Sequence, residues 1–554
     1  MLDRPGDLIM SGGHLVDPAE ADVVVVGSGG AGLLAAAVAA DAGARVVVLE
    51  RAPVLGGTTA VSGGMIWAPG SHLMAAAGCA DVPADAVRYL DRVAEGRVER
   101  RRLEQFVNAA PAMVRYLVEC TPVRLVPIDR PDYHSDWPGA RDAGRCLDNL
   151  PFETAGWPGL AGQVRPGPHF PPLTYPERRA MRWPERHDRG LVARRAADGV
   201  LTLGGALVAG LVAGCRERGV RLIPGSRVRD VLVEGGRVRG VRATTEAGPV
   251  TYRADRGVVL ACGGFEWNAA MRQAFLRDPG AHPVSPPGNT GDGLAMGLRA
   301  GAALAAMTEA WWAPVVRVPG QRYDGRPLAR HVVDERSLPG TILVNRSGRR
   351  FVNESTNYHD LSKAFHVFDP GRYERPNVPA WLVFDATARR SYALVTVSPA
   401  DPDPPWFHRA DTLADLAALV GVDAGGLTGT VRAFNRHAER GDDQDFGRGR
   451  TVHDRYYGDQ RRPGCPCLAP LERPPFYAVR VEPGMLGTKG GLVTDDGGRV
   501  LRDNGKPIAG LYACGNVAAG VTGAGYPGSG GTLGPALVGG FGCGQAVTAA
   551  GGAG

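Results

Sequence analysis

Lysine is nearly missing from this chain of 554 residues. It occurs only at Lys363, Lys489 and Lys506, so almost every basic side chain is an arginine, as is typical of a GC-rich genome. The formal net charge is +6, and acidic residues are interleaved with the basic ones. Because no basic stripe of the kind that binds nucleic acid is present, the composition argues against a nucleic-acid-binding protein.

Cysteine pairs at metal-binding spacing are also lacking. The nine cysteines are an odd number, and the close pair Cys465 and Cys467 has no second pair that would complete a zinc or iron–sulfur site. We therefore expect free thiols, no metal ion and a cytoplasmic location.

Long hydrophobic runs are absent as well. The first 20 residues contain no apolar core of a secretory signal. The longest charge-free apolar stretch, residues 201–215, is too short and too rich in glycine to span a bilayer. We expect a soluble protein with no integral membrane segment.

The most informative segment that is present is residues 21–51, "ADVVVVGSGGAGLLAAAVAADAGARVVVLER". An apolar run predicts a buried strand, and Gly27, Gly29 and Gly32 follow it at the spacing G-x-G-x-x-G. An alanine-rich helix and a second strand ending at Glu50 come next. This order predicts a dinucleotide-binding unit, with a pyrophosphate on the helix N-terminus and Glu50 on ribose hydroxyls.

The continuation favours FAD over NAD. Residues 52–67, "APVLGGTTAVSGGMIW", form a second loop of glycine, serine and threonine instead of an immediate crossover helix. Its backbone amides and hydroxyl groups suit an extended flavin cofactor. No histidine lies between Gly56 and Gly64, and the next one downstream is His72.

Six segments together resemble the fumarate reductase and 3-ketosteroid dehydrogenase flavoprotein superfamily. They are "GGTTAVSGG", "RGVVLACGGFEWN", "NTGDGLAMGLRAGA", "LPGTILVNRSGRRFVNE", "GTKGGLVTD" and "IAGLYACGNVAAG". The resemblance implies an α/β fold: a discontinuous Rossmann-like FAD-binding domain at residues 22–314 and 487–554, interrupted by an α+β substrate-capping domain at 315–486. Residues 1–21 would be an N-terminal extension.

The covalently flavinylated members of the superfamily carry the link on a histidine of the first flavin loop, so the resemblance implies non-covalent FAD here. The residues that it assigns to the cofactor are Gly27, Ser28, Gly29, Gly30, Ala31, Gly32, Glu50, Arg51, Gly57, Thr58, Thr59, Ser62, Gly63, Gly64, Val228, Ala261, Gly263, Asp292, Gly515, Asn516, Gly531, Thr532 and Leu533.

Local patterns predict three further features. The proline- and arginine-rich residues 141–188 indicate a long surface loop. Residues 206–228 predict a helix followed by a parallel strand of the nucleotide-binding sheet. Gly235 and Gly236 predict the turn of a hairpin.

The C-terminal segment "GAGYPGSGGTLGPAL" is rich in glycine but holds one tyrosine, Tyr526. Its "YPGSG" resembles the tyrosine and glycine pair of 3-ketosteroid Δ1-dehydrogenases. The resemblance implies that the Tyr526 phenol and the Gly530 amide bind the C3 carbonyl oxygen of a steroid, as an oxyanion hole does. The N–H groups of the helix that follows would lie beneath the flavin.

Two more tyrosines match the same pattern. Tyr358, in "NESTNYHD", would remove the C2 proton as the base, and Tyr133, in "RPDYHSDWPG", would hydrogen-bond to Tyr358 and lower its pKa. Hydride transfer from C1 to flavin N5 would then leave a C1=C2 bond. The implied activity is that of an FAD-dependent oxidoreductase on CH–CH bonds. On composition alone, a tyrosine in such a loop is more often a packing anchor.

Other assignments stay open from the sequence. A fumarate reductase-like enzyme needs an arginine proton donor before "GTILVN", where this chain has Ser337, with Arg336 beside it. A flavin enzyme that desaturates or reduces another cyclic ketone or enone is a second alternative. A protein with a purely structural FAD is the third. Lys489 suits either a position near the flavin or a solvated loop. The exact ketone, the electron acceptor, the reaction direction and the oligomeric state are open too.

Overall fold

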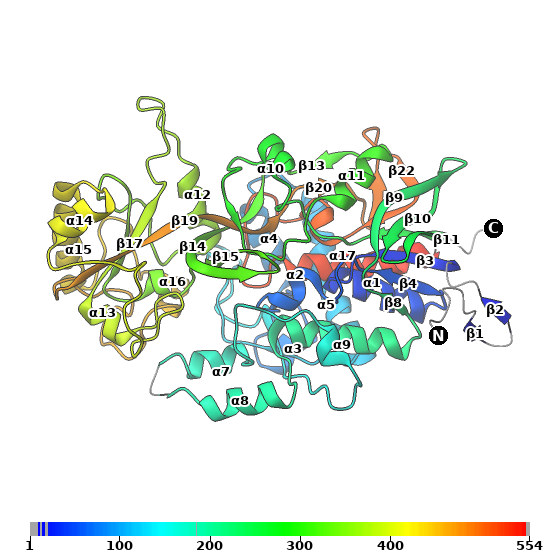
Figure 1. The fold of residues 1–554 in the computed structure, drawn as a ribbon, viewed down its shortest axis with the longest axis horizontal. Helices are drawn as coiled ribbons and strands as arrows, with labels where there is room; N and C mark the ends of the chain where they lie inside the picture. The colour runs from blue at the N-terminus through cyan, green and yellow to red at the C-terminus, as the bar shows by residue number, and fades with distance from the viewer. Residues whose placement is uncertain (1–8, 12–13, 17–19, 184–185, 550–554) are drawn as a thin grey trace.

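The computed structural model of the chain describes residues 9–11, 14–16, 20–183 and 186–549 (Figure 1). Two large sheets organise these residues, one of eight strands and one of seven. Strands β14 (Ala310–Tyr323) and β19 (Phe476–Thr488) extend from the neighbourhood of the first sheet into the second. The expected division of the chain at residues 315 and 487 thus falls within these two strands.

The eight-stranded sheet contains the segment predicted to bind a dinucleotide. Its parallel strands lie in the order β22, β11, β3, β4, β8, and β21 pairs with β22 in antiparallel orientation. The bounds are β3 Glu20–Val26, β4 Val46–Leu49, β8 Arg221–Ile223, β11 Gly248–Leu260, β21 Arg499–Leu501 and β22 Pro507–Ala513. The predicted buried run and the strand before Glu50 are therefore confirmed as β3 and β4.

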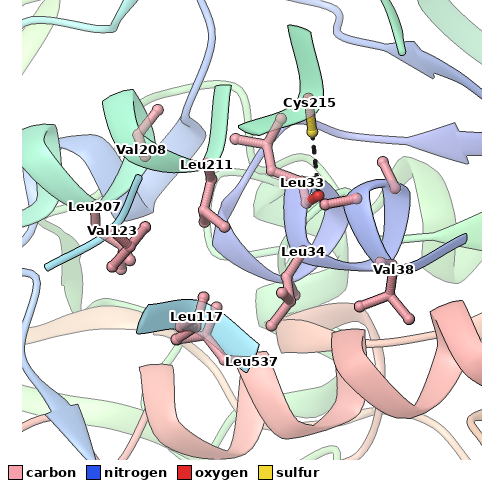
Figure 2. Close-up of a cluster of buried hydrophobic side chains, with 14 of the residues drawn as sticks. Leu33, Leu34, Val38, Leu117, Val123, Leu207, Val208, Leu211, Cys215 and Leu537 are labelled. Carbon is pink, nitrogen blue, oxygen red and sulfur yellow. Dashed lines mark hydrogen bonds between the residues drawn. The ribbon is translucent and has the colours of Figure 1, made fainter. Parts of the chain in front are cut away.

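Helix α1 (Gly30–Asp41) lies at the centre of the main hydrophobic core. Figure 2 shows Leu33, Leu34 and Val38 of this helix beside side chains of α9 (Leu203–Glu217) and α17 (Leu533–Ala549). The Cys215 thiol of α9 donates a hydrogen bond of 3.4 Å to the Leu33 carbonyl oxygen. The helix is apolar on all sides because helices and sheet enclose it.

The glycine motif has the backbone conformation and close packing that the sequence predicts. Gly27 has φ +105°, and a Cβ atom on it would lie 2.5 Å from the Ala261 carbonyl oxygen. A Cβ on Gly32 would lie 2.2 Å from the Gly27 carbonyl oxygen. Only glycine allows this turn and this close packing of α1 on the strand.

The local predictions after residue 200 are also confirmed. Helix α9 is followed by β8, which pairs with β4 in parallel. Strands β9 (Arg227–Glu234) and β10 (Arg237–Thr245) form an antiparallel hairpin through Gly235 and Gly236, which both have positive φ. Two positive φ values are what the tightest hairpin turns require. In the part of the chain that the structure describes, no helix combines the length and the apolarity needed to cross a membrane.

The prediction of a long surface loop at residues 141–188 is wrong in part. Strand β7 (Cys146–Asn149) is buried and pairs with β5 (Ile66–Trp67) and β6 (Leu125–Pro127). Short helices α6 (Leu160–Gln163) and α7 (Tyr175–Ala180) follow, and α8 (Arg189–Ala197) comes next. The Asn149 side chain donates to the Gly64 carbonyl oxygen, which ties this segment to the second glycine loop.

The seven-stranded sheet has the order β15, β14, β19, β17, β16, with β12 and β18 also paired to β19. The remaining bounds are β12 His282–Pro283, β15 Arg326–His331, β16 Thr341–Val344, β17 Ala380–Asp385 and β18 His408–Ala410. Helices α14 (Leu413–Val420) and α15 (Ala424–Arg440) pack on one face of it. Helix α12 (Tyr358–Lys363) contacts β14.

Gly204 of α9 offers a test of how tightly the second glycine loop is held. A Cβ on Gly204 would lie 1.9 Å from the Thr59 carbonyl oxygen, in α2 (Gly57–Val61), so Gly204→Ala forces two backbones apart. We expect this variant to lose about 1–3 kcal/mol of unfolding free energy and part of its FAD. Chemical denaturation and flavin absorbance measure the two effects.

Gly205→Ala is the matched control. Its Cβ would meet Leu201 Cβ at 3.7 Å, an ordinary contact, and alanine favours the helix. Equal stability of the two variants would contradict the proposed close packing.

Candidate active site

One cavity of about 1020 Å³ brings nearly all the predicted site residues together. Tyr133, Tyr358, Tyr526 and Gly530 line it. The predicted cofactor residues on its wall are Gly27, Ser28, Gly29, Gly30, Ala31, Glu50, Arg51, Gly57, Thr58, Thr59, Ser62, Gly63, Gly64, Val228, Ala261, Gly263, Asp292, Gly515, Asn516, Thr532 and Leu533.

Two predicted residues do not line the cavity. Gly32 packs beneath it, against the Gly27 backbone. The Gly531 N–H donates to the Gly528 carbonyl oxygen at 2.9 Å, and a Cβ on Gly531 would meet Pro527 Cδ at 2.8 Å. His72 is also outside the cavity wall.

Polar groups at the nucleotide end are tied to one another. Glu50 accepts hydrogen bonds from the Ser28 N–H at 3.0 Å and the Ser28 hydroxyl at 2.7 Å. Asp292 receives two hydrogen bonds from Arg227, at 2.7 and 2.8 Å, and Arg51 lies 3.5 Å away. Burial disfavours ionisation of Asp292, but the hydrogen bonds and charge of Arg227 outweigh it, so its pKa is lowered.

This end of the cavity fits FAD. The N-terminus of α1 directs backbone N–H groups toward the glycine turn, where they favour a pyrophosphate. Thr59 Oγ1 accepts from the Gly30 N–H at 3.0 Å and thereby joins the two glycine loops. At the other end, helix α17 begins at Leu533, directly after Thr532, and its first N–H groups favour negative charge on a flavin ring.

Three tyrosines from distant segments meet at the opposite end of the cavity. Tyr133 follows β6, Tyr358 begins α12 and Tyr526 precedes α17. Their ring centroids are 5.2 Å apart for Tyr133 and Tyr526, 5.5 Å for Tyr133 and Tyr358, and 5.6 Å for Tyr358 and Tyr526. Each ring meets the others edge to face, so the three hydroxyl groups belong to one buried cluster.

The Gly530 N–H stands beside this cluster and is free. In the described part of the chain, this N–H has no protein acceptor, whereas the Gly530 carbonyl oxygen accepts from the Trp67 N–H at 3.1 Å. Gly530 has φ +88°, and a Cβ there would lie 2.6 Å from both the Met65 carbonyl oxygen and the Trp67 nitrogen. Glycine is therefore required to bring this amide to the cavity wall.

The loop that carries Tyr526 is fixed through its carbonyl groups. The Ala524 oxygen is bound by His359 Nε2 at 2.8 Å, and the Gly525 oxygen by Lys489 Nζ at 2.5 Å. The Pro527 oxygen accepts from the Tyr89 hydroxyl at 2.5 Å and from the Tyr133 N–H at 3.0 Å. Thr532 Oγ1 also donates to the Tyr526 hydroxyl at 2.9 Å.

The position of Lys489 differs from both sequence-based interpretations, a residue near the flavin and a residue of a solvated loop. Its side chain is 1% exposed, does not line the cavity, and lies 4.1 Å from the centroid of the Trp311 ring, which packs on Tyr526. Burial lowers the pKa of Lys489 to about 7. The lysine positions the tyrosine loop and is not solvated.

The expectation that Tyr133 lowers the pKa of Tyr358 is wrong for this structure. Burial and the neighbouring Tyr133 phenol both raise the pKa of Tyr358 well above its usual value. The physical reason is that a phenolate is poorly solvated among apolar rings, and a second neutral phenol brings no positive charge to offset this.

A buried network of charges fixes the segment before Tyr358. Arg350 binds Glu354 and Asp443 with two hydrogen bonds each, and Arg448 also reaches Glu354. Arg336, beside the position where the dicarboxylate enzymes need a proton donor, binds the carbonyl oxygens of Glu354 and Thr356. Arg336 is 1% exposed and does not line the cavity. Its hydrogen bonds therefore hold the backbone of this segment in place.

A dinucleotide-binding turn that opens into a cavity with a buried tyrosine cluster is the architecture of a flavoprotein oxidoreductase. The FAD binding domain family matches residues 22–533. The chain is 39% identical to the 3-oxosteroid 1-dehydrogenase of Mycobacterium tuberculosis, with 94% of this chain and 97% of that enzyme aligned. This protein belongs to the family of FAD-dependent oxidoreductases that includes the 3-oxosteroid 1-dehydrogenases.

Two further relatives narrow the comparison. The chain is 41% identical to the 4-oxocyclohexanecarboxylate 2-dehydrogenase of Sinomonas cyclohexanicum, over 95% of this chain and 92% of that enzyme. A crystal structure of 3-ketosteroid Δ1-dehydrogenase from Sterolibacterium denitrificans with 1,4-androstadiene-3,17-dione matches at TM-score 0.89 and 36% identity. That match covers 96% of this chain and all of the other. The predicted FAD-dependent oxidoreductase and the family resemblance are confirmed.

Sequence reasoning missed several side chains that line the cavity or lie behind the Tyr526 loop. His331 lines the cavity with its ring centroid 4.4 Å from that of Tyr358, and Arg130 and Arg178 also lie on the wall. His359 is buried behind the Tyr526 loop. Arg130 and His359 stand three residues and one residue from predicted tyrosines, which is a signal that the search for motifs did not use.

His359 provides a test of the fixed loop. Its Nδ1 accepts from the Trp312 N–H at 3.2 Å, so Nε2 carries the proton given to Ala524. His359→Leu leaves two buried backbone groups unpaired. We expect a loss of about 1–3 kcal/mol in unfolding free energy and a lower turnover rate with FAD still bound. Denaturation curves measure the loss of stability, and steady-state rates measure the loss of turnover. His408→Leu, at a histidine that does not line the cavity, is the control.

The same histidine predicts a pH dependence. Burial lowers the pKa of His359 to about 3, below its ordinary 6.5. The stability contributed by the neutral ring is complete above pH 6.5 and falls as the pH drops toward 3. The difference in unfolding free energy between wild type and His359→Leu should therefore narrow in acid. A difference independent of pH would contradict the assignment.

Proposed function

We propose that this protein introduces the C1=C2 double bond into a 3-oxosteroid. The observation that supports this best is the pair formed by the Tyr526 hydroxyl and the free Gly530 N–H at one end of a cavity whose other end fits FAD. Two donors on the wall of the same cavity suit a ketone oxygen that gains negative charge as the ketone enolises. The named relatives act on 3-oxosteroids or on oxocyclohexane acids.

In this proposal each tyrosine has one task. Tyr526 and Gly530 hold the carbonyl oxygen, which makes the neighbouring C2–H more acidic. Tyr358 takes the C2 proton, and Tyr133 orients Tyr358. FAD, when bound, supplies the hydride acceptor for C1. Residues 22–314 and 487–554 would hold FAD, and residues 315–486 would cap the substrate and supply Tyr358.

Two alternatives remain distinct in chemistry. A fumarate reductase needs an arginine that reaches its substrate, and Arg336 is held by backbone carbonyl groups away from the cavity. A dehydrogenase of a small cyclic ketone uses the same tyrosines. It is favoured by the 41% identity to the 4-oxocyclohexanecarboxylate enzyme and by arginines on the cavity wall.

Tyr526→Phe tests the oxyanion site. Anaerobic mixing of wild type with a 3-oxo-4-ene steroid should bleach the oxidised flavin absorbance rapidly. In Tyr526→Phe the rate should fall about 10²- to 10³-fold, because one donor to the developing oxyanion is lost. FAD content should stay unchanged. Tyr373→Phe, at a side chain that is 84% exposed, is the matched control. Bleaching at the wild-type rate in Tyr526→Phe would refute the role.

Tyr358 generates a prediction about pH. Because its pKa is raised above the ordinary value of about 10, the ionised fraction still grows with pH throughout the neutral and mildly alkaline range. We expect kcat/KM for the steroid to rise across that range in wild type and in Tyr373→Phe. In Tyr358→Phe the residual rate should be low and should not rise with pH. A retained rise would show that another group is the base.

A further inference from the structure

Arg130 is a buried positive charge with no acidic partner. Its residue is 7% exposed and lines the cavity. One guanidinium nitrogen donates to the Tyr457 hydroxyl at 2.5 Å, while the buried Nε has no partner. Within the described residues, no carboxylate oxygen lies within 4.0 Å of it. The rings of Tyr175, Tyr456 and Tyr457 surround it at 4.9 to 5.5 Å from their centroids.

Arg178, on α7, is half-buried and also lacks an acidic partner among the described residues. Its guanidinium carbon lies 5.2 Å from the Tyr175 centroid and 4.5 Å from that of Phe170. Its buried Nη1 has no hydrogen-bond partner, and it too lines the cavity without an ion pair to any described residue. Arg130 and Arg178 therefore both pack against the Tyr175 ring.

Other arginines of the cavity wall differ in their partners. Arg179 packs on the Tyr456 ring, and Arg330 donates to Gln321 and the Pro168 carbonyl oxygen, neither with an ion pair to a described residue. Others have acidic partners. Arg165 is paired with Asp324, and Arg182 lies 3.8 Å from Asp334. The carboxylate that faces Arg130 and Arg178 from β7 is Asp148, but it is held by the Asn149 and Tyr175 N–H groups at 2.8 and 2.7 Å. Asp148 makes no ion pair with either arginine.

A buried guanidinium without a counter-ion is costly unless a ligand supplies the negative charge. The FAD pyrophosphate belongs at the glycine turn and the N-terminus of α1, at the opposite end from the tyrosines. Arg130 is connected to the tyrosine cluster by contacts: it donates to Tyr457, whose ring meets His453, and the His453 ring meets Tyr133. It therefore lies at the substrate end of the cavity. Guanidinium groups bind carboxylates through paired N–H donors.

We propose that the ketone substrate carries a carboxylate, and that Arg130 and Arg178 together bind it. This inference rests on the proposed dehydrogenation at Tyr526 and names the class of ketone that it acts on. A small oxocyclohexane acid and a steroid with an acidic side chain both present this chemistry.

The test compares acids with their neutral amides. The probes are 4-oxocyclohexanecarboxylate and a 3-oxo-4-ene steroid carboxylic acid, each with its carboxamide, and the readout is kcat/KM of the FAD-loaded enzyme. We expect wild type to prefer the acid over the amide by about 10- to 100-fold for one of the two pairs, and that pair identifies the ring system. Arg178→Gln and Arg130→Gln should each bring this preference close to unity, chiefly through KM.

Controls separate this result from other roles of the two arginines. Arg194→Gln removes a charge from an exposed position of α8 that is outside the cavity wall, and should keep the full preference. If kcat/KM fell equally for acid and amide in the arginine variants, the proposal would be overturned. The arginine charge would then assist the reaction itself and would not bind the carboxylate. Loss of FAD from Arg178→Gln would also overturn it, because the cofactor would then be the counter-ion.

A binding measurement distinguishes failure of this inference from failure of the proposed function. Cyclohexanecarboxylate lacks the ketone, so its binding, followed by the change in flavin absorbance, needs no turnover. Suppose that no ketone is oxidised, but that wild type binds this acid at least tenfold more tightly than its amide and Arg178→Gln binds the two equally. The carboxylate site would then be supported although the proposed reaction had failed. Equal binding of acid and amide in wild type would overturn the inference.

Discussion

The position of Tyr526 depends on one constraint: the carbonyl groups on both sides of it are bound by buried donors from distant segments. His359 and Lys489 bind residues 524 and 525, while Tyr89 and the Tyr133 amide bind Pro527. A loop rich in glycine would otherwise lose a large conformational entropy on being fixed. Because Tyr133 belongs to the tyrosine cluster and His359 follows Tyr358 in the chain, the bonds that hold the loop also bring the three tyrosines together.

The same loop joins the tyrosine end of the cavity to the flavin end. The carbonyl oxygen of Gly530 accepts from the Trp67 N–H, and Trp67 ends the second glycine loop. Asn149 and Gly204 hold that loop from the other side, through the Gly64 oxygen and close contact with Thr59. The proposed donors to the ketone and the loop predicted to hold the flavin are thus connected by backbone contacts, where close packing resists small shifts.

Patterns in the sequence predicted those parts of the fold that are determined by residues within a single segment. The glycine turn, α1, β4 and the hairpin at Gly235 each follow from spacing within one segment. Strand β7 was missed because its polar residues are buried by long-range partners, such as Gly64 for Asn149. The tyrosines were found through a resemblance, but the raised pKa of Tyr358 depends on burial by other segments and cannot be predicted from its neighbours in sequence.

In the functions proposed here, the reaction and the choice of substrate rest on different residues, which would account for similar chains that act on ketones of different size. In the proposed function the tyrosines and the Gly530 amide would contact only the ketone and its neighbouring carbon, which every cyclic ketone offers. Discrimination must come from the rest of the cavity, where α7 and the segment before Tyr133 supply Arg178 and Arg130. A buried charge rejects a neutral substituent more strongly than an apolar wall rejects a longer one, because the charge would stay unpaired. Changing those two positions is therefore a short route from one substrate to another that leaves the chemistry of the tyrosines intact.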